Sequence, residues 1–166
     1  LIQEVSKSEP NIDQVKKLLR QGASANSHEI ETGITVLQIA CKNNNAQLVQ
    51  TLIDLGAGVL IKDKNLRTPL HEAARYSSAE VLQILLDAKA SVLAKDKDGN
   101  TPFYDSIEDG NIEKINLLIQ AKTNLSLQNN NGTSPLMLVL QKKNYKLAKR
   151  LIDLEAEINQ QDRTGK

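Results

Sequence analysis

The stretch KDKNLRTPLHEAARYSS, residues 62–78, returns in altered form as KDKDGNTPFYDSIEDGN at residues 95–111. The two segments lie 33 residues apart and share a Thr-Pro pair behind an Asp-containing turn. A fixed period of roughly 20–50 residues indicates a chain built from stacked repeats. The rest of the chain is therefore expected to repeat at the same spacing.

The period extends through most of the chain. The positions that align with the Thr of the Thr-Pro pair are each 33 residues apart: Thr35, Thr68, Thr101 and Ser134. The second half of each unit also returns, as LVQTLIDLGA, VLQILLDAKA, KINLLIQAKT and LAKRLIDLEA, ending at Ala57, Ala90, Thr123 and Ala156. Each copy is therefore expected to form the same structural unit.

The residue types within one unit predict a turn, a short helix, a second turn and a longer helix. Asp63 opens the first turn, because Asx side chains bond to nearby backbone groups. Thr68 then caps a helix, with Pro69 at the first position, where no hydrogen-bond donor is lost. Apolar residues follow at helical spacing over 81–86. One unit cannot bury both of its faces, so neighbouring units must stack.

This pattern resembles the ankyrin repeat, Asp-x-x-Gly-x-Thr-Pro-Leu-His-x-Ala-Ala followed by Val-x-x-Leu-Leu-x-x-Gly-Ala. The unit 63–95 carries the matching residues Asp63, Thr68, Pro69, Leu70, His71, Ala73, Ala74, Val81, Leu85, Leu86 and Ala90. The resemblance covers nearly the whole chain. It implies an all-α solenoid of stacked helix-turn-helix units with projecting finger turns that resemble β-hairpins.

We expect one array over residues 1–166. It comprises a partial N-terminal repeat (1–29), full repeats at 30–62, 63–95, 96–128 and 129–161, and the start of a further repeat at 162–166. One extra residue lies in the connection from Ala23 to Gly33. Because the chain starts at Leu1 and stops inside a recurring turn, we interpret it as a segment of a longer protein.

Three departures from the pattern are informative. Leu66 replaces a Gly, and a positive φ there would cost about 1 kcal/mol. Leu66 therefore marks either a slightly altered turn or an apolar contact for a ligand. His71 is expected to form a local hydrogen bond that ties turns together. Larger or polar residues replace the Ala-Ala pair at 106–107 and 139–140, which predicts slightly different packing there.

The sequence predicts no enzyme, cofactor, metal site or small-molecule substrate. His28 and His71 lie in different units, with no further Cys or His at zinc-ligand spacing. The single cysteine, Cys41, falls at a small-residue core position, so we expect a buried structural thiol. It also excludes an internal disulfide framework, which fits a reducing compartment. The Gly-Ala-Gly at 56–58 lacks the spacing of a phosphate-binding loop.

The bulk charge points to neither nucleic acid nor a membrane. The net charge is +1, and no apolar run approaches the roughly 20 residues of a membrane helix. The one basic cluster fits the solvated face of a helix; a contact with an acidic partner is the alternative, and nucleic acid is disfavoured because no aromatic residues interleave. This cluster comprises Lys142, Lys143, Lys146, Lys149 and Arg150.

We expect a monomeric array inside the cell, in the cytoplasm or nucleus. The high Asn and Lys content is typical of an AT-rich genome. If the source is an intracellular bacterium, delivery into the host cell becomes the expected location.

The resemblance implies that a protein or peptide binds in a concave groove formed by the first helices and the finger turns. Among the residues there, Arg67, Arg75 and Tyr76 are of the types that dominate binding hot spots. A basic unit followed by an acidic unit would suit a partner segment of mixed charge. The predicted contact residues are Lys64, Asn65, Arg67, Glu72, Arg75, Tyr76, Lys97, Asp98, Asn100, Asp105, Glu108, Asp109, Asn131 and Lys142. The alternative is a regulatory or spacer segment of a larger enzyme or channel, with its contacts inside the same polypeptide.

Overall fold

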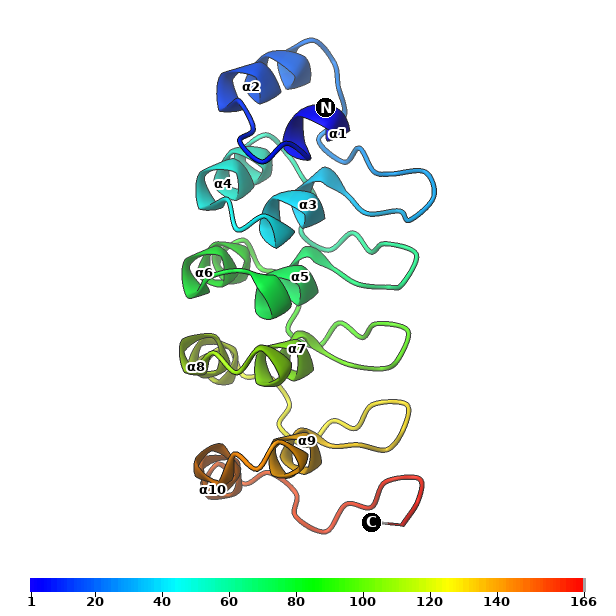
Figure 1. The fold of residues 1–166 in the computed structure, drawn as a ribbon, viewed down its shortest axis with the longest axis vertical. Coiled ribbons are helices and arrows are strands. Elements are labelled where there is room, and N and C mark those ends of the chain that lie inside the picture. Colours follow the sequence, from blue (N-terminus) through cyan, green and yellow to red (C-terminus); the bar gives the residue numbers. More distant parts are fainter. Residues whose placement is uncertain (166) are drawn as a thin grey trace.

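The computed structural model describes residues 1–165, which form a stack of paired helices joined by turns (Figure 1). The first helices of the pairs form one layer, the second helices form another, and the finger turns project beside the first layer. The two ends of the chain lie at opposite ends of the stack. The all-α ankyrin-type solenoid predicted from the sequence is confirmed. The helices are α1 (Ile2–Val5), α2 (Ile12–Arg20), α3 (Val36–Lys42), α4 (Ala46–Asp54), α5 (Pro69–Tyr76), α6 (Ala79–Asp87), α7 (Pro102–Asp109), α8 (Ile112–Gln120), α9 (Pro135–Gln141) and α10 (Tyr145–Asp153).

Local capping explains where the helices begin. Helix α5 starts behind Thr68, and the backbone N–H of Thr68 donates to Nδ1 of His71 at 3.1 Å. Helix α4 starts behind Asn45, whose side-chain oxygen accepts from the backbone N–H of Leu48 at 2.9 Å. These bonds satisfy donors that a helix leaves free at its N-terminus.

The finger turns are closed by Asx side chains, as the sequence predicts. Oδ1 of Asp63 accepts from the backbone N–H groups of Asn65 and Arg67 at 2.8 and 2.9 Å. The backbone N–H of Asp63 also donates to the carbonyl of Arg67 at 2.9 Å. The first finger closes from Glu29 to Ile34, one residue wider, which accounts for the extra residue in that connection.

One backbone hydrogen bond joins each finger to the next. The donor and acceptor pairs are Lys64 to Thr32 (3.0 Å), Lys97 to Asn65 (3.0 Å), Asn130 to Asp98 (2.9 Å) and Arg163 to Asn131 (3.2 Å). The close approach requires Gly99 (φ +79°), because a Cβ there would lie 2.8 Å from the backbone nitrogen of Asn130. Leu66, which replaces the Gly of the pattern, has a positive φ of 61°, and its side chain is exposed.

A second set of bonds ties the first helices α3, α5 and α7 to the segment of the finger that follows. Nε2 of Gln38 donates to the carbonyl of Arg67 at 3.1 Å, and Nε2 of His71 lies 3.2 Å from the carbonyl of Asn100. The hydroxyl of Tyr104 donates to the carbonyl of Leu127 at 2.7 Å. The predicted role of His71 as a tie between turns is confirmed.

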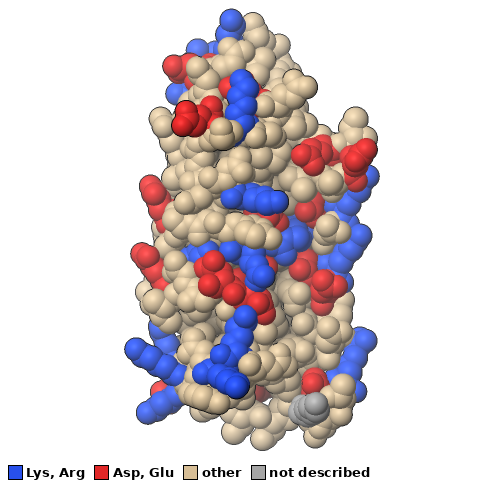
Figure 2. Space-filling view, viewed as in Figure 1, with Lys and Arg blue, Asp and Glu red and all other residues tan. Residues whose placement is uncertain are grey.

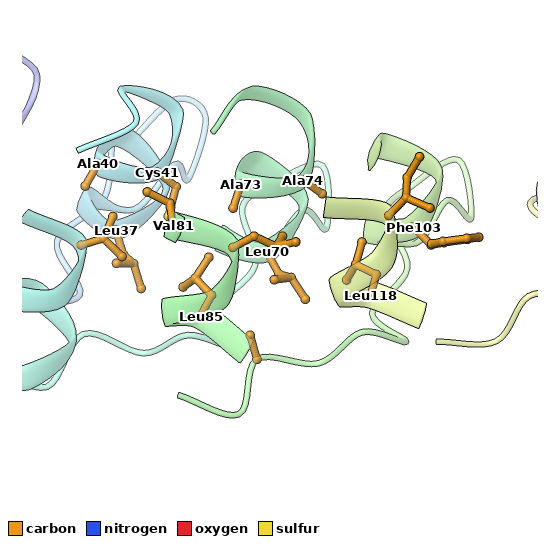
Figure 3. Packing of buried hydrophobic residues seen from close by; sticks show 14 of the residues in the cluster. Leu37, Ala40, Cys41, Leu70, Ala73, Ala74, Val81, Leu85, Phe103 and Leu118 are labelled. Atoms are coloured by element: carbon orange, nitrogen blue, oxygen red, sulfur yellow. The ribbon is translucent and has the colours of Figure 1, made fainter. Parts of the chain in front are cut away.

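The core runs along the stack between the two helix layers. Leu37, Leu70 and Phe103 occupy the same position on successive first helices and are buried (Figure 3). Small residues such as Ala73 and Ala74 let neighbouring helices approach closely. Ser106, which replaces an alanine, is buried, and its hydroxyl donates to the carbonyl of Phe103 at 2.7 Å. Burial of each leucine side chain contributes about 2 kcal/mol to stability.

The N-terminal stretch forms the predicted helix pair, α1 and α2. Val5 and Val15 are fully buried and face the array as expected. Among residues 1–165, no helix has both the length and the hydropathy needed to cross a membrane.

Candidate functional site

The predicted contact residues lie on α5, α7, the end of α9 and the finger turns between them (Figure 1). Arg67, Glu72, Arg75 and Asn100 are half-buried, and Asp105 is buried. The remaining predicted residues are exposed: Lys64, Asn65, Tyr76, Lys97, Asp98, Glu108, Asp109, Asn131 and Lys142. We call the surface formed by these residues the groove.

Arg67 is held by acidic side chains from its own unit and the next. Its Nε lies 2.7 Å from Oε1 of Glu72. Its Nη1 lies 3.4 Å from Oδ2 of Asp96 and 3.3 Å from Oδ2 of Asp105. The Arg67 side chain is only 20% exposed. This arginine therefore links two repeats, a role that the hot-spot prediction did not include.

Asp105 has the most unusual environment of the predicted residues. The residue is 8% exposed, and its Oδ2 receives no hydrogen bond, although Nη1 of Arg67 lies 3.3 Å away. Burial raises the pKa of Asp105 to about 7, against the opposing effect of Arg67. The carboxyl group of Asp105 therefore keeps its proton to a higher pH than an exposed aspartate does.

Glu108 joins two basic side chains across the units. Its Oε2 lies 2.8 Å from Nζ of Lys142 and 3.4 Å from Nη1 of Arg75. The hydrogen bond from Lys142 lowers the pKa of Glu108. In Figure 2, acidic and basic atoms are interleaved over the middle of the visible face. The expected basic unit and acidic unit therefore neutralise much of each other's charge inside the groove.

Tyr76 is the exposed aromatic residue of the groove. It is 53% exposed at the end of α5. Nζ of Lys42 on α3 lies 5.7 Å from the centre of its ring, within the range of a cation–π contact. Its ring thus offers apolar area and a polar hydroxyl on the same accessible side chain.

A pocket of about 240 Å³ opens in the groove between α7 and α9. The sequence indicates some of its residues as contact residues but predicts no pocket. Asn129 donates from Nδ2 to Oδ1 of Asn100 at 2.9 Å, which fixes one wall. The lining residues are Asn100, Tyr104, Asp105, Glu108, Asn129, Thr133, Leu138 and Gln141.

Sequence reasoning missed Lys114, a buried lysine on α8. Its side chain is 1% exposed, and Nζ donates to the carbonyl of Ser77 at 2.7 Å, at the end of α5. The same Nζ lies 2.9 Å from Oδ2 of Asp109. Asp109 therefore takes part in an internal ion pair and is less available for contact with a partner. The sequence did contain a sign of this burial, because Lys114 aligns with the apolar residues Leu48, Val81 and Leu147 in the other units.

Cys41 and His71, two titratable groups outside the groove, are structural. Burial raises the pKa of the Cys41 thiol, and burial lowers the pKa of His71 to about 4, so both are neutral at pH 7. Across residues 1–165, no three His, Cys, Asp or Glu side chains are grouped as metal ligands. The predicted basic cluster runs from the end of α9 along α10, where Arg150 donates to Oδ1 of Asn116.

Comparison with known proteins supports the repeat interpretation. The family model described as ankyrin repeats (3 copies) matches residues 2–96 and 89–162. No match was found among curated proteins. The two family matches overlap at 89–96 and together span nearly the whole chain.

Proposed function

Because the chain belongs to the ankyrin repeat family, we propose that its groove and finger turns bind a partner protein or peptide. Ankyrin repeats are generally protein-interaction modules. We propose this role for a monomeric array inside the cell, where the free thiol of Cys41 would stay reduced.

The observation that carries the proposal is the set of exposed side chains that neither the core nor the hydrogen bonds between repeats use. Tyr76 is 53% exposed, and Lys64 and Lys97 project from successive fingers. The fingers are linked through their backbones, so these two side chains are left to solvent. A surface with a rigid backbone and variable side chains suits specific recognition, because little ordering entropy is lost on binding.

Affinity capture from a lysate of the source cells tests the proposal. The groove variant carries Lys64→Ala, Tyr76→Ala and Lys97→Ala, and it leaves the Arg67 ion pairs intact. A matched control carries Glu80→Ala, Glu113→Ala and Lys122→Ala, which are exposed and belong to the second-helix side. Both variants should match the unfolding midpoint of the parent array.

We expect a protein that the parent and the control variant retain and that the groove variant loses. The captured protein should then bind the purified parent array directly, with an affinity at least about tenfold above that for the groove variant. Equal binding to the parent and the groove variant would overturn the proposal.

A further inference from the structure

The pocket between α7 and α9 is lined on its charged side by acids alone. Asp105 is the buried acid and Glu108 the exposed one. Asn100, Asn129 and Gln141 add side-chain amides, whose oxygens are further acceptors. The volume of about 240 Å³ lies below the roughly 300–1,000 Å³ of ordinary small-molecule pockets. The site therefore suits one long side chain of a larger partner.

One oxygen of the buried Asp105 carboxylate lacks a hydrogen-bond donor, whereas its Oδ1 accepts a long bond from Nη1 of Arg67 at 3.5 Å. Oδ2 of Asp105 receives no hydrogen bond, and its residue is 8% exposed. Arg67 is shared among three carboxylates, those of Glu72, Asp96 and Asp105, so one positive charge faces three acidic groups. A buried carboxylate oxygen without a donor is costly, and a ligand that brings a donor would relieve that cost.

We propose that this pocket receives an arginine side chain from the partner protein. The inference rests on the proposed function and names the chemistry of one contact within it. A guanidinium presents several N–H donors in one plane, which can reach the Asp105 carboxylate and a neighbouring amide oxygen together. The methylenes of the arginine would lie against Leu138 and the ring of Tyr104, which also line the pocket.

Lys142 forms an ion pair with the exposed carboxylate that lines this pocket. Its Nζ lies 2.8 Å from Oε2 of Glu108, so the protein's own ammonium already satisfies the outer carboxylate. An incoming guanidinium competes with it for Glu108. Lys142→Ala removes this ammonium and should therefore strengthen arginine binding. If Lys142 instead contacts the partner directly, Lys142→Ala should weaken binding of the partner.

The test uses a probe that does not depend on knowing the partner. N-acetyl-arginine amide is titrated into the array, and N-acetyl-citrulline amide, which has a similar shape and no charge, serves as its control. Nuclear magnetic resonance follows the side-chain amide signals of Asn100, Asn129 and Gln141. We expect saturable shifts at these signals, with the arginine probe binding at least about tenfold more tightly than the citrulline probe.

Variants locate the site. Asp105→Asn keeps the shape and removes the charge, and Gln141→Lys places a second ammonium at an exposed position of the same pocket. Each should weaken arginine binding by at least about fivefold, while Glu80→Gln on α6 should leave it unchanged. If Asp105→Asn does not fold, Gln141→Lys alone tests whether arginine binds in this pocket.

Equal binding of the two probes would overturn the arginine pocket, and so would unchanged arginine binding in Gln141→Lys. If the partner is still captured through the groove, the proposed function survives that result. Conversely, the pocket could bind arginine while capture of the partner does not depend on the groove. That result would support the arginine pocket and overturn the proposed function.

Discussion

Nη1 of Arg67 lies 3.3 Å from Oδ2 of Asp105, a residue that follows 38 positions later and belongs to the next pair of helices. The ion pair therefore joins two successive repeats. Glu72 and Asp96 complete the set around the same guanidinium.

Arg67→Ala should destabilise the array strongly, because three carboxylates would then face one another without a cation. We expect a loss of about 3 kcal/mol in the free energy of unfolding at pH 7, measured by urea denaturation. Arg67→Lys keeps a charge but loses the planar fork, so its loss should be smaller. A change below about 0.5 kcal/mol for Arg67→Ala would indicate an ordinary surface pair instead.

His71 should make stability depend on pH. Its folded-state pKa is about 4, below the ordinary 6.5, because it is buried. Between pH 6.5 and 4 the unfolded chain takes up a proton that the folded chain does not, so stability falls as the pH falls. The loss from this group has an upper limit of about 3 kcal/mol at pH 4.

The matched variant for this prediction is His71→Gln, because Gln38 makes the same tie one unit earlier. The variant should keep most of the parent's stability at pH 7.5, and it should lose less stability than the parent does when the pH is lowered. Urea midpoints at pH 7.5 and 4.5 measure this, and the comparison cancels the contributions of the carboxylates. Parallel pH profiles for the two proteins would show that His71 is not responsible.

Lys114→Ala should also be costly, since it removes the donor to the carbonyl of Ser77 and leaves Asp109 without its cation. We expect a loss of about 3 kcal/mol by chemical denaturation. The double variant Lys114→Leu with Asp109→Asn restores the apolar residue found in the other units and removes the unpaired charge. It should lie within about 1 kcal/mol of the parent, and a loss equal to that of Lys114→Ala would refute this account.

Cys41 should be protected from thiol reagents in the folded array. It is fully buried, and burial raises the pKa of its thiol, so the reactive thiolate is scarce. We expect the folded protein to react at least about a hundredfold more slowly than the protein in urea. Similar rates in the two states, followed by absorbance of the released thiol reporter, would contradict the buried position.

The sequence was sufficient for features that depend on neighbours a few residues away. The Thr68-Pro69 helix start and the Asp63 turn both follow from local chemistry repeated at a fixed interval. The repeat period then placed those pieces in one stack. For this reason the fold could be predicted before any coordinates were known.

The candidate site was harder to predict, because its contacts join residues in different units. Arg67 was expected to meet a partner, but whether an arginine turns outward or toward Asp96 and Asp105 depends on how adjacent repeats are rotated. The burial of Lys114 depends on the same stacking. Comparison of aligned positions between units would have marked Lys114, yet it could not have given its acceptor.

The single backbone hydrogen bond between neighbouring fingers has a mechanical consequence. Helix layers are held by broad apolar contact, whereas neighbouring fingers are joined by polar contacts: one backbone hydrogen bond each and, between some pairs, side-chain bonds such as that from Nδ2 of Asn130 to the carbonyl of Lys97 at 2.8 Å. We therefore expect a change in curvature to alter the finger spacing before it alters the packing of the helices. A rigid partner that spans several fingers would select one curvature and stiffen the whole stack.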